Sequence, residues 1–173
     1  MSQLRVFNTS IFLFAIFLIQ ETIVSRINFP INGFSLYIAA LMVVLSLEDR
    51  TGSMVFGFIG GIIMDLSIAA DTPFGQWALV MTVMGYLFSI NKESIGDFTE
   101  TPVLFVGFIS IASGLSLVFF AIVGTLLGEE MGGIFRNLRL IFVNSLWTFL
   151  IIPLFLPFIV KMRKIMMTSR EKS

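Results

Sequence analysis

The sequence of 173 residues contains no cysteine and no histidine. Histidine is the commonest general base near neutral pH, and thiolates and imidazoles are the usual ligands of zinc and copper. We therefore expect a protein that is not an enzyme and that has no metal or organic cofactor. Without cysteine no disulfide can form, so the sequence carries no information on the redox compartment.

Charged residues are also scarce. Eleven basic and eleven acidic residues make up 13% of the chain, whereas 57% of the residues are hydrophobic. A soluble domain carries about 25% charged residues, and the mean hydropathy of +0.98 leaves too little polar surface for a soluble enzyme or a nucleic-acid-binding domain. The sequence therefore predicts a protein that lies in a lipid bilayer and binds no nucleic acid.

Apolar runs separated by charged residues or by Gly and Pro predict the architecture. A membrane-spanning helix needs about 20 residues, so the chain has room for five or six spans. We expect an all-α, polytopic membrane protein, a compact bundle of about six transmembrane helices in one domain, 1–160, followed by a basic cytoplasmic tail, 161–173. The predicted spans are 5–24, 34–47, 52–67, 74–91, 102–127 and 136–160.

The basic residues sort unequally between the two sides of six such spans. One side has eight: Arg5, Arg50, Lys92 and, in the tail, Lys161, Arg163, Lys164, Arg170 and Lys172. The other side has three: Arg26, Arg136 and Arg139. By the positive-inside rule both termini of this multi-pass membrane protein face the cytoplasm, and Lys161, Arg163 and Lys164 act as topology anchors.

Glycines are concentrated in the third predicted span and the turn after it. At 100° per residue Gly57, Gly61 and Asp65 share one helical stripe, with Gly60 beside it and Gly75 after the turn. Small residues in a stripe let another helix approach closely. The neighbour is either another helix of the same chain or the transmembrane helix of a partner. In the turn that follows, Thr72 is a candidate N-cap and Pro73 fits the first helical position.

Asp65 has two readings. An acid inside a span usually faces protein or water and has a role, but at the end of a span it is a solvated helix terminus. Glu21 is placed similarly, and Arg136 and Arg139 lie at a comparable depth. An internal ion pair between Asp65 and Arg139 is our first expectation, with Glu21 as the second acid.

The fifth and sixth predicted spans carry the remaining unusual residues. The fifth has five small ones, expected to form a packing face: Gly107, Ser110, Ser113, Gly114 and Ser116. In the sixth, Pro153 and Pro157 each remove a backbone donor and can kink the helix. Interrupted helices that bind transported substrates usually occur in matched pairs. The chain has no matching partner span, so we do not expect a symmetric carrier.

Three segments together resemble the rod shape-determining protein MreD family: 57–66 (GFIGGIIMDL), 73–79 (PFGQWAL) and 85–87 (GYL). The chain length and the number of spans also agree. One departure is that the family often begins its second span with Pro-Asp, whereas this chain reads Asn32-Gly33-Phe34-Ser35. Any role of that aspartate therefore has no counterpart here.

The resemblance implies a non-enzymatic scaffold of the bacterial cell-elongation machinery. Its implied partners are MreC, MreB, RodA and a class B penicillin-binding protein. Members of the family also look similar to the substrate-binding subunits of vitamin importers. The alternative is therefore an importer subunit that binds a small molecule through Asp65, Glu21, Arg139 and Asn144. A packed seam at the outer ends of the helices would favour the scaffold, and a cavity there would favour the importer.

Overall fold

The computed structural model describes residues 3–26, 34–67, 73–99, 101–129 and 133–166. These residues form seven α-helices and one short 3-10 helix, so the predicted all-α class is confirmed. In chain order they are α1 (Gln3–Thr22), η1 (Val24–Arg26), α2 (Leu36–Leu47), α3 (Arg50–Asp65), α4 (Gln76–Ile90), α5 (Lys92–Thr99), α6 (Pro102–Leu126) and α7 (Ile134–Met166).

Each of the six predicted spans corresponds to one helix, but two details differ. The short helix α5 lies where the sequence predicted only a loop, because three of its eight residues are charged and it has no long apolar run. At the other end of the chain, α7 continues to Met166, so the predicted boundary at residue 160 falls inside a helix. Lys161, Arg163 and Lys164 lie on its last turns. Residues 167–173 of the predicted tail lie outside the described part of the chain.

Three helical segments are long and apolar enough to cross a membrane, which indicates a multi-pass membrane protein. They are Gln3–Arg26, Pro102–Leu126 and Phe135–Met162, with 24, 25 and 28 residues. The helices between them are shorter, with 12 residues in α2, 16 in α3 and 15 in α4. At a rise of 1.5 Å per residue these three reach roughly 18–24 Å, less than the ~30 Å of a bilayer's hydrocarbon core.

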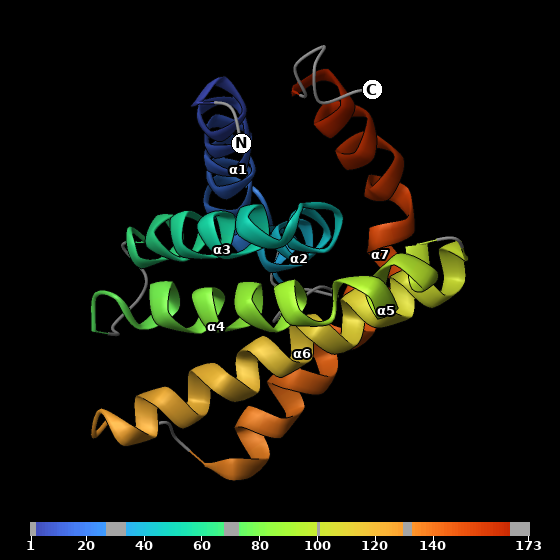
Figure 1. Ribbon diagram of the computed structural model, residues 1–173. Helices are drawn as coiled ribbons and strands as arrows, with labels where there is room; N and C mark the ends of the chain where they lie inside the picture. The colour runs from blue at the N-terminus through green and yellow to red at the C-terminus, as the bar shows by residue number, and fades with distance from the viewer. Residues whose placement is uncertain (1–2, 27–33, 68–72, 100, 130–132, 167–173) are drawn as a thin grey trace.

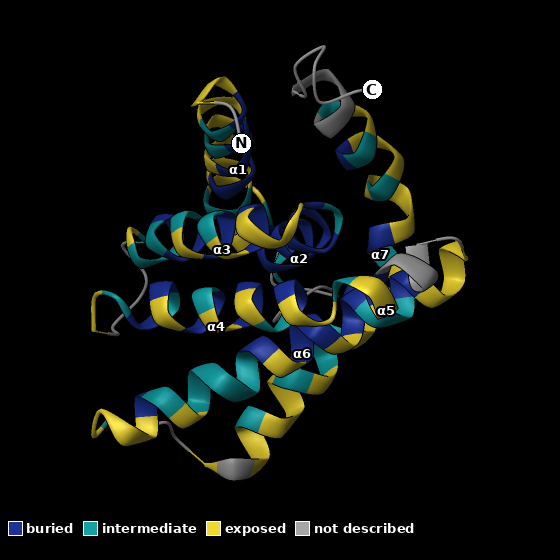
Figure 2. Ribbon diagram, viewed as in Figure 1, coloured by how far each residue is buried: buried dark blue, intermediate teal, exposed yellow. Residues whose placement is uncertain are grey.

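The short helix α2 is the centre of the core. All of its residues except Leu47 are buried, and Figure 2 shows this helix almost entirely in the colour of buried residues. It contacts α1, α3, α6 and α7, which explains why its sequence is apolar on every face. A hydrogen bond also joins its first turn to α3: the buried Tyr37 hydroxyl donates to the Gly60 carbonyl at 2.9 Å.

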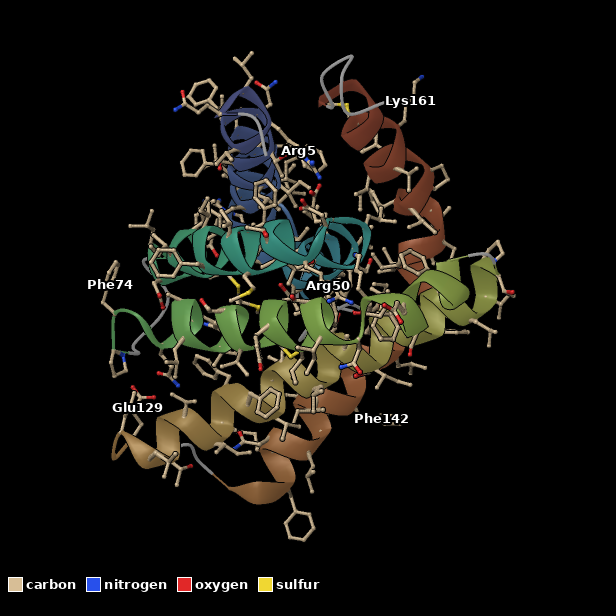
Figure 3. All side chains as sticks on the ribbon, viewed as in Figure 1. Arg5, Arg50, Phe74, Glu129, Phe142 and Lys161 are labelled. Atoms are coloured by element: carbon tan, nitrogen blue, oxygen red, sulfur yellow. The ribbon has the colours of Figure 1, made fainter. Side chains whose placement is uncertain are left out.

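The other helices are arranged around α2 in an order that Figure 1 makes visible. Helices α3 and α4 lie side by side, and α6 packs along the other side of α4. Helix α7 has two limbs: Phe142 is on the limb that accompanies α6, and Lys161 is on the limb that turns toward α1 (Figure 3). Pro153 and Pro157 lie between those residues, and the missing backbone hydrogen bonds of two prolines account for the bend.

Glycines bring α3 and α4 into backbone contact. A Cβ added at Gly61 would lie 2.5 Å from the Cα of Ala78, and one at Gly57 would collide with the Met81 carbonyl oxygen. Gly85 of α4 is equally close to the backbone of Ser53 on α3. The stripe predicted from the sequence therefore packs within the chain, and the reading in which it receives a partner's helix is wrong, since α4 already occupies that face.

Gly60 and Gly75 have different roles from this pair of stripe glycines. A Cβ on Gly60 would lie 2.6 Å from Leu41, so Gly60 makes the contact with α2. Gly75 precedes α4 with a φ of 98°, a left-handed conformation that only glycine adopts without strain, and nothing lies within 4 Å of its Cβ position. Gly75 is therefore a turn residue that packs against no helix in the described part of the chain, and its alternative role as a partner contact stays a prediction.

We predict that Gly61→Leu strongly destabilises the fold, because the added side chain meets helix backbone, which cannot rotate away. Overpacking usually costs about 1–3 kcal/mol, and a backbone collision should reach the top of that range or exceed it. Thermal unfolding in detergent, followed by circular dichroism, measures the effect. Gly107→Leu is the matched control, since it too is a helical glycine but has open space around its Cβ position. Equal melting temperatures for the two variants would contradict the close backbone packing of α3 against α4 at Gly61.

Candidate functional site

Polar contacts gather at two opposite ends of the helices α1 to α4. We call one the Asp65 end; it contains the C-terminal turns of α1 and α3 and the first turns of α2 and α4. We call the other the Glu48 end; it contains the N-terminal turn of α1, the α2–α3 turn and the α4–α5 junction. Each end holds chain segments that are distant in the sequence.

Asp65 caps the neighbouring helix at the Asp65 end. Its two carboxylate oxygens each accept one backbone N–H bond of 3.0 Å, from Trp77 and from Ala78. These are the second and third residues of α4, whose amides have no partner inside the helix. A carboxylate there is also favoured by the helix dipole. Gly75, at the N-cap position, has no side chain to cap with, so Asp65 performs this function from α3.

This contact replaces the ion pair expected from the sequence. Both Asp65 oxygens are bonded to α4, Arg139 is exposed on α7, and no ion pair between described residues joins Asp65 or Glu21 to Arg139. The prediction of that pair is therefore wrong. So is the prediction of Pro73 as the first helical residue, since α4 begins at Gln76. Thr72 lies outside the described residues.

Two further side chains of α1 hold the Asp65 end together. Glu21 Oε1 accepts a hydrogen bond of 3.1 Å from the Ser67 hydroxyl, just beyond α3. Gln20 Oε1 accepts one of 2.8 Å from the backbone N–H of Leu36, the first residue of α2. Glu21 and Asp65 thus lie at the same end of the bundle, as predicted from their depth, but they bind different groups.

A small pocket opens between these contacts. It has a volume of about 180 Å³. Its walls combine aromatic, amide, hydroxyl and carboxylate side chains from the four helix ends: Phe17, Gln20, Glu21, Ser35, Tyr37, Met64, Ser67 and Trp77. Within the described parts of the chain no cluster of three or more acidic residues could hold a metal ion.

The Glu48 end is organised by a buried ion pair that the sequence pattern does not predict. Arg5 Nη2 of α1 donates to Glu48 Oε2, and the two side chains are only 7% and 1% exposed. Beside them Asp49 caps α3 by accepting from the Gly52 N–H at 2.9 Å. The Lys92 ammonium donates to the Ser46 carbonyl, so the α4–α5 junction is fastened to the same turn.

Small and polar residues also line the contact between α6 and α7. Four of the five small residues predicted to form a packing face are buried, and a Cβ on Gly114 would meet the Ser145 hydroxyl. The fifth, Gly107, has open space around it. From α7 the buried Thr148 hydroxyl donates to Asn144 Oδ1 at 3.2 Å. Asn144 is therefore buried and hydrogen-bonded within α7, and it does not line the pocket at the Asp65 end.

Comparisons with protein-family models, with curated proteins and with solved structures found no match for this chain.

We predict that Asp65→Ala lowers the free energy of unfolding by about 1–2 kcal/mol, the usual cost of losing a helix cap. Chemical unfolding in detergent measures it. Arg139→Gln serves as the control and should leave stability unchanged, because Arg139 is exposed and makes no ion pair with Asp65. A stability loss in Asp65→Ala no larger than that in Arg139→Gln would contradict the capping role of Asp65.

The buried pair at the Glu48 end gives a larger expected effect. Arg5→Met should cost about 3–5 kcal/mol, because it removes the guanidinium that is paired with the buried Glu48 carboxylate. Arg5→Met/Glu48→Leu should recover part of that loss, and a double-mutant cycle measures the coupling. Arg50→Met is the control, since Arg50 and Glu93 pair at 3.2 Å in an exposed position and such pairs are worth less than about 1 kcal/mol. If the changes in unfolding free energy caused by Arg5→Met and Glu48→Leu were simply additive, the two side chains would not interact and the ion pair would be contradicted.

Proposed function

We propose that this protein is a non-enzymatic, six-pass subunit of the bacterial cell-elongation machinery, similar to the MreD family, which acts as a scaffold in the inner membrane. In this proposal it links MreC, MreB, RodA and a class B penicillin-binding protein by contact. It carries out no chemistry of its own.

The observation that carries the proposal is the structural role of the residues behind the resemblance. Gly57, Gly61 and Gly85 pack α3 against α4, and Asp65 caps α4. These residues build a closely packed helix pair. None of the four lines the pocket, although Met64 and Trp77 of the same segments do. A motif whose residues pack and cap helices favours a structural protein that acts by presenting surfaces to partners.

The distribution of charge supports six passes with both termini in the cytoplasm. Arg5, Arg50 and Lys92, which the positive-inside count assigns to one side, all lie at the Glu48 end. The acids Glu21 and Asp65 lie at the opposite end. Helices α1 to α4 therefore alternate in direction between two polar ends, as consecutive membrane spans do.

The proposal assigns partner contact to the outward faces of α6 and α7, since α4 covers the glycine stripe. Phe135 is 87% exposed and Phe142 is 68% exposed on α7, and Leu126 is exposed on α6. Between the two helices lies an apolar groove of about 390 Å³, lined by Val118, Ala121, Ile122, Thr125, Leu126, Asn137, Leu138 and Ile141. An apolar face with a groove suits a partner's transmembrane helix, which packs through shape rather than charge.

The importer alternative receives less support. Of its four expected ligand-binding residues only Glu21 lines the pocket. Asp65 caps α4, Asn144 is buried and bonded to Thr148 of its own helix, and Arg139 is exposed on α7. The pocket of about 180 Å³ is also smaller than the ~300–1,000 Å³ typical of sites for vitamin-sized ligands.

Purification from native membranes after photo-crosslinking tests the proposal. With a crosslinking amino acid at Phe142, we expect wall-synthesis proteins among the products identified by mass spectrometry. The matched control places the same amino acid at Phe7, a similarly accessible aromatic position on α1, where we expect fewer such products. Recovery of the energising subunits of an importer, without wall-synthesis proteins, would overturn the scaffold in favour of the alternative.

A further inference from the structure

The pocket at the Asp65 end has the composition of a site for a positively charged ligand. Phe17, Tyr37 and Trp77 provide three aromatic walls, and Glu21 is the one formally charged side chain in the lining. Ring contacts hold these walls in place: Phe17 and Tyr37 meet edge to face at 5.7 Å, and Trp77 stacks on Phe120 at 4.1 Å. Aromatic rings attract cations through the negative faces of their π systems.

Glu21 retains unused capacity to accept hydrogen bonds. An ionised carboxylate offers about four acceptor sites, and within the described residues Glu21 receives one hydrogen bond, from Ser67. None of the ion pairs between described residues includes it, and Arg26, the nearest cation along the chain, is exposed on η1. The half-buried carboxylate therefore lies in the pocket wall without a cation from the described part of this chain.

We propose that this pocket binds an organic ammonium group, with Glu21 as counter-ion and Phe17, Tyr37 and Trp77 as a partial aromatic cage. The volume of about 180 Å³ admits a small group of the size of ethanolamine or choline. A carboxylate and three aromatic rings disfavour an anion, and a neutral ligand of the same shape would lack both the ionic and the cation–π attraction. The ligand class follows from these two kinds of wall together.

Two sources can supply this chemistry. One is the ethanolamine headgroup of a phospholipid, because the pocket lies at the end of the candidate span Gln3–Arg26, where headgroups are found. The other is a soluble amine in the compartment outside the membrane. The inference does not depend on the scaffold function, since it concerns the Asp65 end and not the partner faces of α6 and α7.

Tryptophan fluorescence tests the proposal, because Trp77 lines the pocket and Trp147 is the chain's other tryptophan. The protein carries Trp147→Phe and is placed in phosphatidylglycerol nanodiscs. It is titrated with choline and, separately, with 3,3-dimethyl-1-butanol, the neutral molecule of the same shape. A second arm compares Trp77 emission in phosphatidylethanolamine nanodiscs with that in phosphatidylglycerol nanodiscs.

A saturable change with choline, absent with the alcohol, supports a soluble ligand. A difference between the two lipids without a choline response supports the headgroup. In either case Glu21→Gln should weaken binding at least about tenfold or abolish the lipid difference, and Glu129→Gln, an acid in the α6–α7 loop, should change nothing. Equal responses to choline and the alcohol, no response in either arm, or full binding in a folded Glu21→Gln variant would overturn the proposal. If Glu21→Gln does not fold, the proposal is still tested by the comparison of choline with the alcohol and by the comparison of the two lipids.

Discussion

The backbone contact between α3 and α4 is the constraint on which the rest of the structure depends. Gly57 and Gly61 from one helix and Gly85 from the other remove the side chains that would separate them. The close approach also brings the end of α3 within hydrogen-bonding distance of the start of α4, so that Asp65 can cap it. Packing and capping therefore stabilise each other, and both position the walls of the small pocket at that end.

Several polar groups in this protein are paired between elements that lie far apart in the sequence. Arg5 reaches Glu48, Lys92 reaches the Ser46 carbonyl, and Gln20 reaches the Leu36 amide. In an apolar environment such bonds matter because an unpaired polar group has no water to bind. The helices between these contacts, α2 above all, are then free to be almost entirely apolar. The Asp65 and Glu48 ends fix how α1 to α4 align, and the apolar core fills the space between them.

Much of this architecture could be predicted from the sequence, and the part that could not is non-local. Long apolar runs predicted six of the seven helices. They did not predict α5, because a short amphipathic helix has no long apolar run. The spacing of Gly57 and Gly61 predicted close packing but could not name the neighbour. The depth of Asp65 in its span marks it as unusual, but its capping of α4 depends on how the two helices approach each other. Arg5 and Glu48 are 43 residues apart, and only the fold brings them together.

The shortness of α2, α3 and α4 has a consequence for the surrounding bilayer. Helix α2 is shielded by protein, but α3 and α4 present exposed apolar side chains, among them Phe58 and Leu79, on helices of roughly 22–24 Å. In the proposed six-pass topology this side of the protein is several ångströms thinner than an average hydrocarbon core, whereas α6 and α7 match or exceed it. Hydrophobic mismatch of this kind thins the membrane locally. In that topology the protein would have a thin-bilayer side and a full-thickness side, and neighbouring membrane proteins would be sorted between them by the lengths of their own spans.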